Sequence, residues 1–320
     1  MTSSLPAEAR EAFSRFVTCE YTTVGARQQP ITWPVTPYYS DGGPTIDVTT
    51  GLGYPKKADD AKRHPSVSLL FSDPTGSGLE QPAQVLVQGT AEVDDVDLER
   101  NADRYFRESA EKLPATKKMH PPKPIRRMFG WYYTRIYVYV RPERVLIWRH
   151  GDVGAEPEVH DAHMEEVRSG HSEEPPEEHG DPAPGATAWD ERMDALGRDN
   201  DTAAVSWLGP DGFPLSTRLP IEVDPATREI RLTREPTGLP LTPGRSCLAV
   251  HRHAPDFTWQ RNFQVRGNLE RDARGWKLAP RKLVGGIELP EGVAGRYKSF
   301  LSRTIPYRRR AKRRLRERAR

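Results

Sequence analysis

The chain has 320 residues, of which 36% are hydrophobic, and a formal net charge of +3. This length predicts about two domains, each large enough to bury a core of its own. No apolar run approaches the roughly 20 residues that a membrane-spanning helix needs, and residues 1–13 do not read as a secretory signal. Because Cys19 and Cys247 stand in apolar stretches, we expect buried free thiols and a cytoplasmic location.

The charge is unevenly distributed along the chain. Residues 308–320 contain nine basic residues and one acidic residue. This tail therefore carries +8 and leaves the rest of the chain at about −5, which is not the charge of a nucleic-acid-binding body. We expect a solvated tail; the alternatives are contact with nucleic acid or another acidic partner, and closure of the tail over a polyanionic cofactor.

The first half is rich in strands and has a few short helices. Helical spacing of apolar residues predicts helices at 7–16 and 97–113, and 56–64 is compatible with a short helix that ends before Pro65. Strands are expected at 17–24, 31–39, 45–50, 67–71 and 83–93, with two more strands in 132–148 around a turn at 141–144. Pro34 and Pro37 place the second strand at a sheet edge or a bulge. This order favours an antiparallel barrel over a doubly wound sheet.

The second half repeats the first, with small deletions. The matches are Gly25 with Gly209 and Pro30 with Pro214 at a shift of 184, Ser66–Leu70 with Ser246–Val250 at 180, and Gly89 with Gly267 at 178. The second copy lacks the basic segment 54–64 and has the shorter segment 238–245 in its place. A duplication with one-sided loss predicts two domains that share one site.

The domain boundaries follow from composition. We expect a first domain with the cofactor phosphate site at 1–150, an acidic linker containing histidines at 151–186, a second and degenerate domain at 187–295, and a basic C-terminal helix or tail at 296–320, interrupted near Pro306. In the linker, His160 and His163 stand near Glu165 and Glu166. Their spacing is too loose for a recognised metal site, and no metal site is predicted.

The best candidate site is a strand end followed by a basic helix. Thr49 and Thr50 end a strand, and a turn with Gly51 and Gly53 leads to Lys56 and Lys57. Hydroxyls, ammonium groups and the free backbone donors of a helix start together favour an anion such as phosphate. The alternative is an ordinary hairpin followed by a solvated basic helix. His251 and His253 follow a strand of the second half, where we expect them in contact with solvent, or else facing the pocket as proton donors or ligands.

From about residue 25 to 107 the sequence resembles the pyridoxamine 5′-phosphate oxidase-like superfamily of FMN-binding split barrels. The segments that carry the resemblance are 46–73, 84–93 and 98–105, with similarity to the closing strands at 135–148. The resemblance implies a mainly β (α+β) fold of two tandem split β-barrels with short flanking helices, a pseudo-dimer in one chain. In this superfamily the cofactor usually lies between two barrels of a homodimer, and here the second copy would take the part of the partner.

The resemblance also implies the cofactor-binding residues. Lys56 and Lys57 match the basic pair that holds the flavin phosphate, and Thr49 and Thr50 match a strand end that reaches phosphate or ribityl. The remaining matches are Thr32, Trp33, Pro34 and Val35, whose backbone would line the isoalloxazine ring, and Gln84, which would contact the ring or the ribityl chain.

The resemblance therefore implies a flavin-dependent oxidoreductase that transfers hydride between FMN and a small organic substrate. The alternatives are a deazaflavin-dependent reductase and a non-catalytic flavin- or ligand-binding protein whose basic tail contacts an acidic partner. No catalytic acid or base stands out, and a homo-oligomer is compatible with the sequence. Oxidation of vitamin B6 is not expected, because the C-terminal substrate-binding segment of true pyridoxamine phosphate oxidases has no counterpart here.

Overall fold

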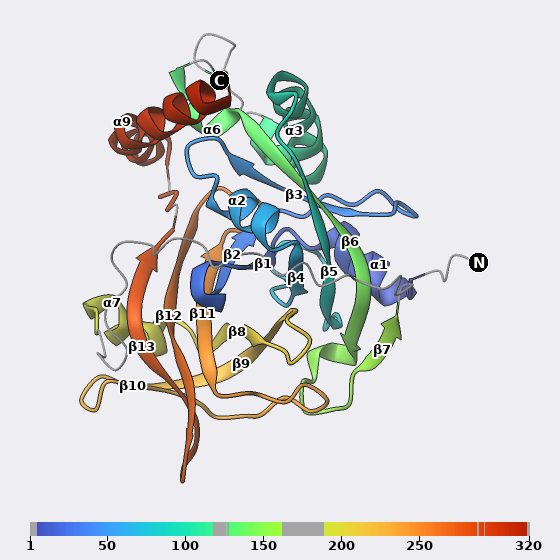
Figure 1. Ribbon diagram of the computed structural model, residues 1–320, viewed down its shortest axis with the longest axis vertical. Coiled ribbons are helices and arrows are strands. Elements are labelled where there is room, and N and C mark those ends of the chain that lie inside the picture. Colours follow the sequence, from blue (N-terminus) through green and yellow to red (C-terminus); the bar gives the residue numbers. More distant parts are fainter. Residues whose placement is uncertain are drawn as a thin grey trace.

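The computed structural model describes residues 5–117, 126, 128–161, 189–286, 288–290 and 292–318. The protein is mostly β, with one sheet in each half and a few short helices around them (Figure 1). Much of the predicted linker, including His163, Glu165 and Glu166, lies outside the described residues. Among those that are described, no helix combines the length and the apolar character needed to cross a membrane.

The first half forms an open sheet with helices on its outside. Its strands are β1 (Cys19–Val24), β2 (Pro30–Val35), β3 (Ile46–Gly51), β4 (Ser66–Phe71), β5 (Gln84–Asp94), β6 (Arg135–Trp148) and β7 (Glu158–Asp161). Its α-helices are α1 (Ala7–Arg15), α2 (Lys56–Arg63), α3 (Leu98–Lys112), α4 (Pro114–Lys117) and α6 (Gly130–Tyr133). Helix α3 begins where predicted because the Asp97 carboxylate accepts a hydrogen bond from the backbone N–H of Arg100.

The second half forms a closed barrel. Its strands are β8 (Thr202–Leu208), β9 (Pro214–Asp224), β10 (Glu229–Leu232), β11 (Gly244–His253), β12 (Gln260–Asp272) and β13 (Gly275–Gly285), and its helices are α7 (Glu191–Asp194), α8 (Leu196–Asp199) and α9 (Val293–Arg318). Residues 233–243, between β10 and β11, contain no helix. The counterpart of α2 is therefore missing, as the repeat predicts.

The two sheets have the same strand order. In the first half it is β2-β1-β4-β5-β6-β3, and in the second it is β9-β8-β11-β12-β13-β10, closed by the pairing of β10 with β9. The first half is joined at the corresponding point by a single bridge, between Tyr38 and Asp47. Strand β2 thus has one strand neighbour in its own sheet, which confirms the edge position predicted from Pro34. The fold is that of two tandem split barrels.

The register of the strands refines the repeat. Tyr21 pairs with Leu69 in the first half, and Val205, at a shift of 184, pairs with Leu248. Leu69 and Leu248 are therefore equivalent at a shift of 179, one residue less than the sequence match suggested. The correction matters because a slip of one residue exchanges the two faces of a strand.

The predicted pair of strands around 141–144 is wrong, because β6 is one continuous strand with a bulge. Gln88 pairs with Arg144 while Gly89 pairs with Pro142, so Glu143 is the extra residue. The second half has the same irregularity, where Gly267 pairs with Pro280. A bulge tolerates a proline, which has no N–H to donate. Because a proline between charged residues is also typical of a turn, the sequence alone predicted a turn here.

The halves meet through equivalent strands around a pseudo-two-fold axis. Thr22 faces Thr32 across β1 and β2, and Ser206 faces Ser216, each at a shift of 184. The four buried hydroxyls bond to one another, with Oγ–Oγ distances from 2.7 Å for Thr32–Ser206 to 3.3 Å for Thr22–Ser206. Contact between equivalent positions is what two-fold packing requires.

The basic tail is a helix that returns to the first half. Helix α9 follows the second barrel in the chain but lies beside α6 (Figure 1). Arg314 pairs with Asp59 on α2 and with Asp95 after β5, at 2.5 and 3.3 Å. The helix is continuous across Pro306, which corrects the predicted interruption. Cys19 and Cys247 are buried free thiols, as expected.

The equivalent bulges generate a matched prediction. A Cβ on Gly89 would lie 2.2 Å from the Arg141 carbonyl oxygen, and a Cβ on Gly267 would lie 2.2 Å from that of Ala279. Because backbone must shift in both cases, we expect Gly89→Ala and Gly267→Ala each to lower the free energy of unfolding by about 1–3 kcal/mol in denaturant titrations. Gly130→Ala, where the nearest atom lies at 3.7 Å, is the control and should not destabilise. An unchanged midpoint for the first two variants would contradict the shared bulge geometry.

Candidate cofactor phosphate site

The start of α2 carries the predicted basic pair, but the two lysines have different surroundings. Lys56 Nζ lies 3.2 Å from the buried Asp60 carboxylate, which also pairs with Arg63. Lys57 Nζ has no hydrogen-bond acceptor or ion-pair partner among the described residues and lies 5.9 Å from the centre of the Tyr54 ring. Burial, together with the neighbouring Arg135, lowers the pKa of Lys57 to about 8. Lys57 is therefore the cation whose charge is not compensated.

Arg135 is the second cation of the site, and the sequence did not reveal it. It begins β6 beside Gly51, is only 5% exposed, and donates a hydrogen bond of 3.1 Å from Nη1 to the Tyr54 hydroxyl. Its guanidinium lies 3.9 Å from the centre of the Tyr105 ring and 4.3 Å from that of Tyr132. Its Nε has no hydrogen-bond partner among the residues that the structure describes. Aromatic rings offer a cation only part of what a carboxylate gives, so this site retains a positive field.

The two threonines lie at the same end of the sheet. Thr50 is buried and donates a hydrogen bond of 2.9 Å to the Tyr54 carbonyl oxygen, which holds the turn between β3 and α2. Thr49 is half-buried and pairs with Tyr137 on β6. The end of β3, with Thr49 and Thr50, thus lies next to the start of α2, with Lys56 and Lys57. The role of Thr50 is to fix the backbone of the turn between them. The first turn of α2 has no side-chain cap, which leaves backbone donors at its start.

Aromatic residues cover this end of the sheet. Tyr307 of α9 stacks on Trp131 with ring centres 5.0 Å apart, and the Trp131 indole N–H donates to the Thr304 hydroxyl at 3.2 Å. Gly53 permits this packing, since a Cβ there would lie 2.9 Å from the Cβ of Tyr307. Helix α9 therefore packs against this end of the sheet through Thr304 and Tyr307.

The other predicted cofactor residues lie in the seam between the two halves. Thr32 belongs to the buried hydroxyl cluster. Gln84 donates to the Thr217 hydroxyl at 2.9 Å and accepts from the Arg218 backbone N–H at 3.4 Å. Trp33 and Pro34 are half-buried and Val35 is buried. A Cβ on Gly286 would lie 2.9 Å from the Trp33 ring, so β2 reaches the end of β13. The structure thus places Lys56 and Lys57 at the start of α2, and Thr32 and Gln84 in the seam between the halves.

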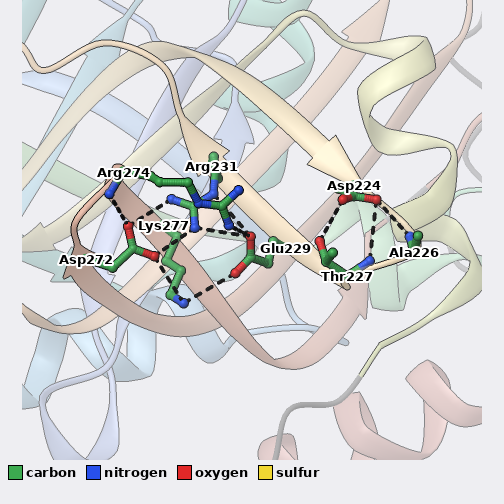
Figure 2. A network of polar contacts seen from close by, with 8 residues as sticks. All are labelled: Asp224, Ala226, Thr227, Glu229, Arg231, Asp272, Arg274 and Lys277. Atoms are coloured by element: carbon green, nitrogen blue, oxygen red, sulfur yellow. Dashed lines mark hydrogen bonds and ion pairs between the residues drawn. The ribbon is translucent and has the colours of Figure 1, made fainter.

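A second charged cluster, on the outer end of the second barrel, is compensated. Figure 2 shows basic side chains interleaved with Glu229 and Asp272, with an Arg231–Asp272 contact of 2.7 Å and an Arg274–Glu229 contact of 2.6 Å. A cavity of about 430 Å³ adjoins it, lined in part by Glu229 and Lys277. Each charge in this cluster has an opposite partner, so the cluster stabilises the β10–β13 pairing. Unlike the site at Lys57, it needs no external ion to compensate its charge.

The pKa of Lys57 makes the stability of the protein depend on pH. An unfolded lysine keeps its proton up to a pKa of about 10.5, whereas folded Lys57 loses its proton above about pH 8. The unfolded state therefore binds more protons between these values, so this group makes stability rise with pH across that window. We expect Lys57→Met to remove this contribution and to flatten the rise, measured by urea unfolding at pH 7 to 10. Lys298→Met, at an exposed position of α9, is the control, and an unaltered pH profile in Lys57→Met would contradict the assignment.

Comparisons with known proteins give structural neighbours only. No family model and no curated protein matches the chain. A structure titled putative pyridoxamine 5′-phosphate oxidase from Listeria innocua is 17% identical, covers 44% of this chain and 98% of its own, and has a TM-score of 0.31. A FAD-binding protein from Mesorhizobium loti is 16% identical, covers 44% of this chain and 92% of its own, and has a TM-score of 0.31. A heme-binding protein from Mycobacterium smegmatis is 17% identical, covers 49% of this chain and 59% of its own, and has a TM-score of 0.34. The structural neighbours of the chain thus include pyridoxamine 5′-phosphate oxidase-like proteins, matched over about half its length.

Proposed function

We propose that this protein binds a phosphorylated flavin and serves as a flavin-dependent oxidoreductase for a small organic substrate. The observation that carries the proposal is the pair Lys57 and Arg135. Both cations contact Tyr54, and neither has a carboxylate partner in the described part of the chain. A pair of this kind is costly without an anion, because nothing compensates the partly desolvated charges. A phosphate group would supply that compensation.

The residues fit a phosphate in chemistry as well as charge. Lys57 and Arg135 offer charge-assisted donors, and the uncapped start of α2 adds backbone N–H groups and the positive end of a helix dipole. When bound, the flavin would supply the hydride chemistry. The chain would hold the phosphate at Lys57 and Arg135 and present β2, with the half-exposed Trp33, toward the ring.

Two alternatives remain within this proposal. A deazaflavin carries phosphate too and would use the same cations. A non-catalytic ligand-binding protein with an acidic partner is favoured by α9, whose Arg308, Arg309, Arg310, Lys312 and Arg313 are exposed while Arg314 is engaged with Asp59. Salt-sensitive retention on nucleic acid or on an acidic protein would support that second alternative.

The test is cofactor binding by purified protein. We expect FMN to bind with a change in its visible absorbance and fluorescence, and Lys57→Met to weaken binding about 10- to 100-fold, the loss of one charge-assisted contact. Affinity should also fall as the pH rises above about 8, where Lys57 loses its proton. Lys62→Met is the matched control on the same helix, since Lys62 pairs with Asp95 at 2.8 Å.

The outcomes separate the alternatives. Uptake of a deazaflavin but not of FMN would assign the same site to the other cofactor. Binding of neither, or equal binding by Lys57→Met and the control, would overturn the proposal. Binding without turnover of any reduced nicotinamide or small organic substrate would favour the non-catalytic alternative.

A further inference from the structure

A second cluster of chemistry-bearing residues lies in the seam between the halves, away from Lys57. Asp73 follows β4 of the first half, and His251 and His253 end β11 of the second. Asp73 Oδ2 lies 3.6 Å from His251 Nδ1 and 3.8 Å from His253 Nε2, and the three ligand atoms all fall within 4.8 Å of one another. Both imidazoles are at least 98% buried.

The fold explains how residues so far apart in sequence meet. His251 and His253 are two positions apart on a strand, so they face the same side, and their rings are parallel with centres 6.0 Å apart. Strands β4 and β11 hold equivalent places in the two sheets. The pseudo-two-fold packing brings the ends of these two strands together. Solvent contact was the expected state of the two histidines, and that expectation is wrong for both.

The proton on His253 is fixed by the backbone. Its Nδ1 lies 2.9 Å from the Ala254 carbonyl oxygen, which can only accept, so Nδ1 carries the hydrogen. Nε2 then accepts a hydrogen bond of 3.1 Å from the Thr18 hydroxyl and lies 3.8 Å from Asp73 Oδ2.

The other histidine is oriented by a buried carboxylate. His251 Nε2 lies 2.7 Å from Glu20 Oε1, and Arg218 and Ser72 donate to the same oxygen. Arg218 Nη2 also lies 3.2 Å from His251 Nε2. Among the described residues His251 Nδ1 has no hydrogen-bond partner; it is buried and lies 3.6 Å from Asp73 Oδ2.

The third member is oriented in the same manner. Asp73 Oδ1 accepts the Thr75 backbone N–H at 3.0 Å, which leaves Oδ2 facing both imidazoles. Two imidazole nitrogens and a carboxylate oxygen thus lie within 4.8 Å of one another. A cation bound among them would take the lone pair of His253 Nε2 in place of the Thr18 hydroxyl, and would give the buried His251 Nδ1 the partner that it lacks among the described residues.

We propose that Asp73, His251 and His253 bind a divalent transition-metal ion of the Zn²⁺ type. Zinc takes imidazole and carboxylate ligands at about 2.0–2.1 Å in tetrahedral geometry, which places ligand atoms about 3.3 Å apart. The two distances to Asp73 Oδ2, 3.6 and 3.8 Å, are near this value, and the three ligand atoms lie within 4.8 Å of one another, so metal binding would draw the three side chains together. Each ligand has an outer partner that sets its orientation, namely Thr75, Glu20 and Ala254, as metal-binding residues commonly do.

The site has three protein ligands, which leaves one position for water or a small ligand. Asp73 is the member with some exposure, at 17% of its side chain, and it supplies the way in from solvent. The competing arrangement is a metal-free one, in which His251 carries two protons and lies as a cation between Glu20 and Asp73.

The experiment is metal binding by tag-free, full-length protein. After chelation and dialysis we expect one Zn²⁺ per chain by elemental analysis and calorimetry, a raised melting temperature, and a visible Co²⁺ spectrum typical of a four-coordinate nitrogen and oxygen site. We expect Asp73→Asn and His253→Gln to abolish stoichiometric binding, and Glu20→Gln to weaken it about 10- to 100-fold. His160→Ala, at a partly exposed imidazole of β7, should bind like the wild type.

Zinc binding by the wild-type protein tests the proposal even if a variant fails to fold. Less than one Zn²⁺ per chain, with no change in melting temperature, would overturn the proposal and favour the protonated His251 arrangement. Stoichiometric binding that persists in folded Asp73→Asn and His253→Gln would also overturn it, because the metal would then lie elsewhere.

Discussion

The packing of two equivalent sheets across one buried, polar seam is the constraint on which the remaining structure depends. Four hydroxyls at equivalent positions satisfy one another there, and Glu20 on β1 meets Arg218 on β9. Leu70 and Leu86 of the first sheet join the apolar core of the second barrel. Most buried polar groups have a hydrogen-bond partner, and Thr32 and Gln84 find theirs across the seam, at Ser206, Thr217 and the Arg218 backbone.

The same constraint separates the two candidate sites. The cations Lys57 and Arg135 lie beside Tyr54, whose ring packs against Tyr307 of α9 with ring centres 5.8 Å apart. Because β4 and β11 end near the axis, Asp73 meets His251 and His253. Because the second half lacks a counterpart of α2, the chain has one cationic site of this kind. The cluster of Asp73, His251 and His253 also occurs once, because it takes residues from both halves.

The sequence was a good guide to local structure and a poor one to long-range contacts. Alternation and turn residues predicted most strands, and the repeat predicted the missing helix. The bulge at Pro142 was read as a turn, since a proline between charged residues has the same local signature in both. Arg135 was missed because a strand that begins with arginine gives no sign that tyrosines from three other segments will surround it. The return of α9 was invisible for the same reason.

Charge compensation decides which polar clusters are sites. Around Glu229 and Asp272, three basic groups meet two acidic ones on the surface, and the network stabilises a strand pair without requiring anything further. Within the described part of the chain, Lys57 and Arg135 meet aromatic rings and a hydroxyl but no carboxylate, and at Asp73 a carboxylate oxygen lies within 3.8 Å of two imidazole nitrogens. The first imbalance calls for an anion and the second for a cation. An anion would not bind at the carboxylate and imidazoles, and a cation would not bind at Lys57 and Arg135. One chain can therefore hold both ligands without competition between them.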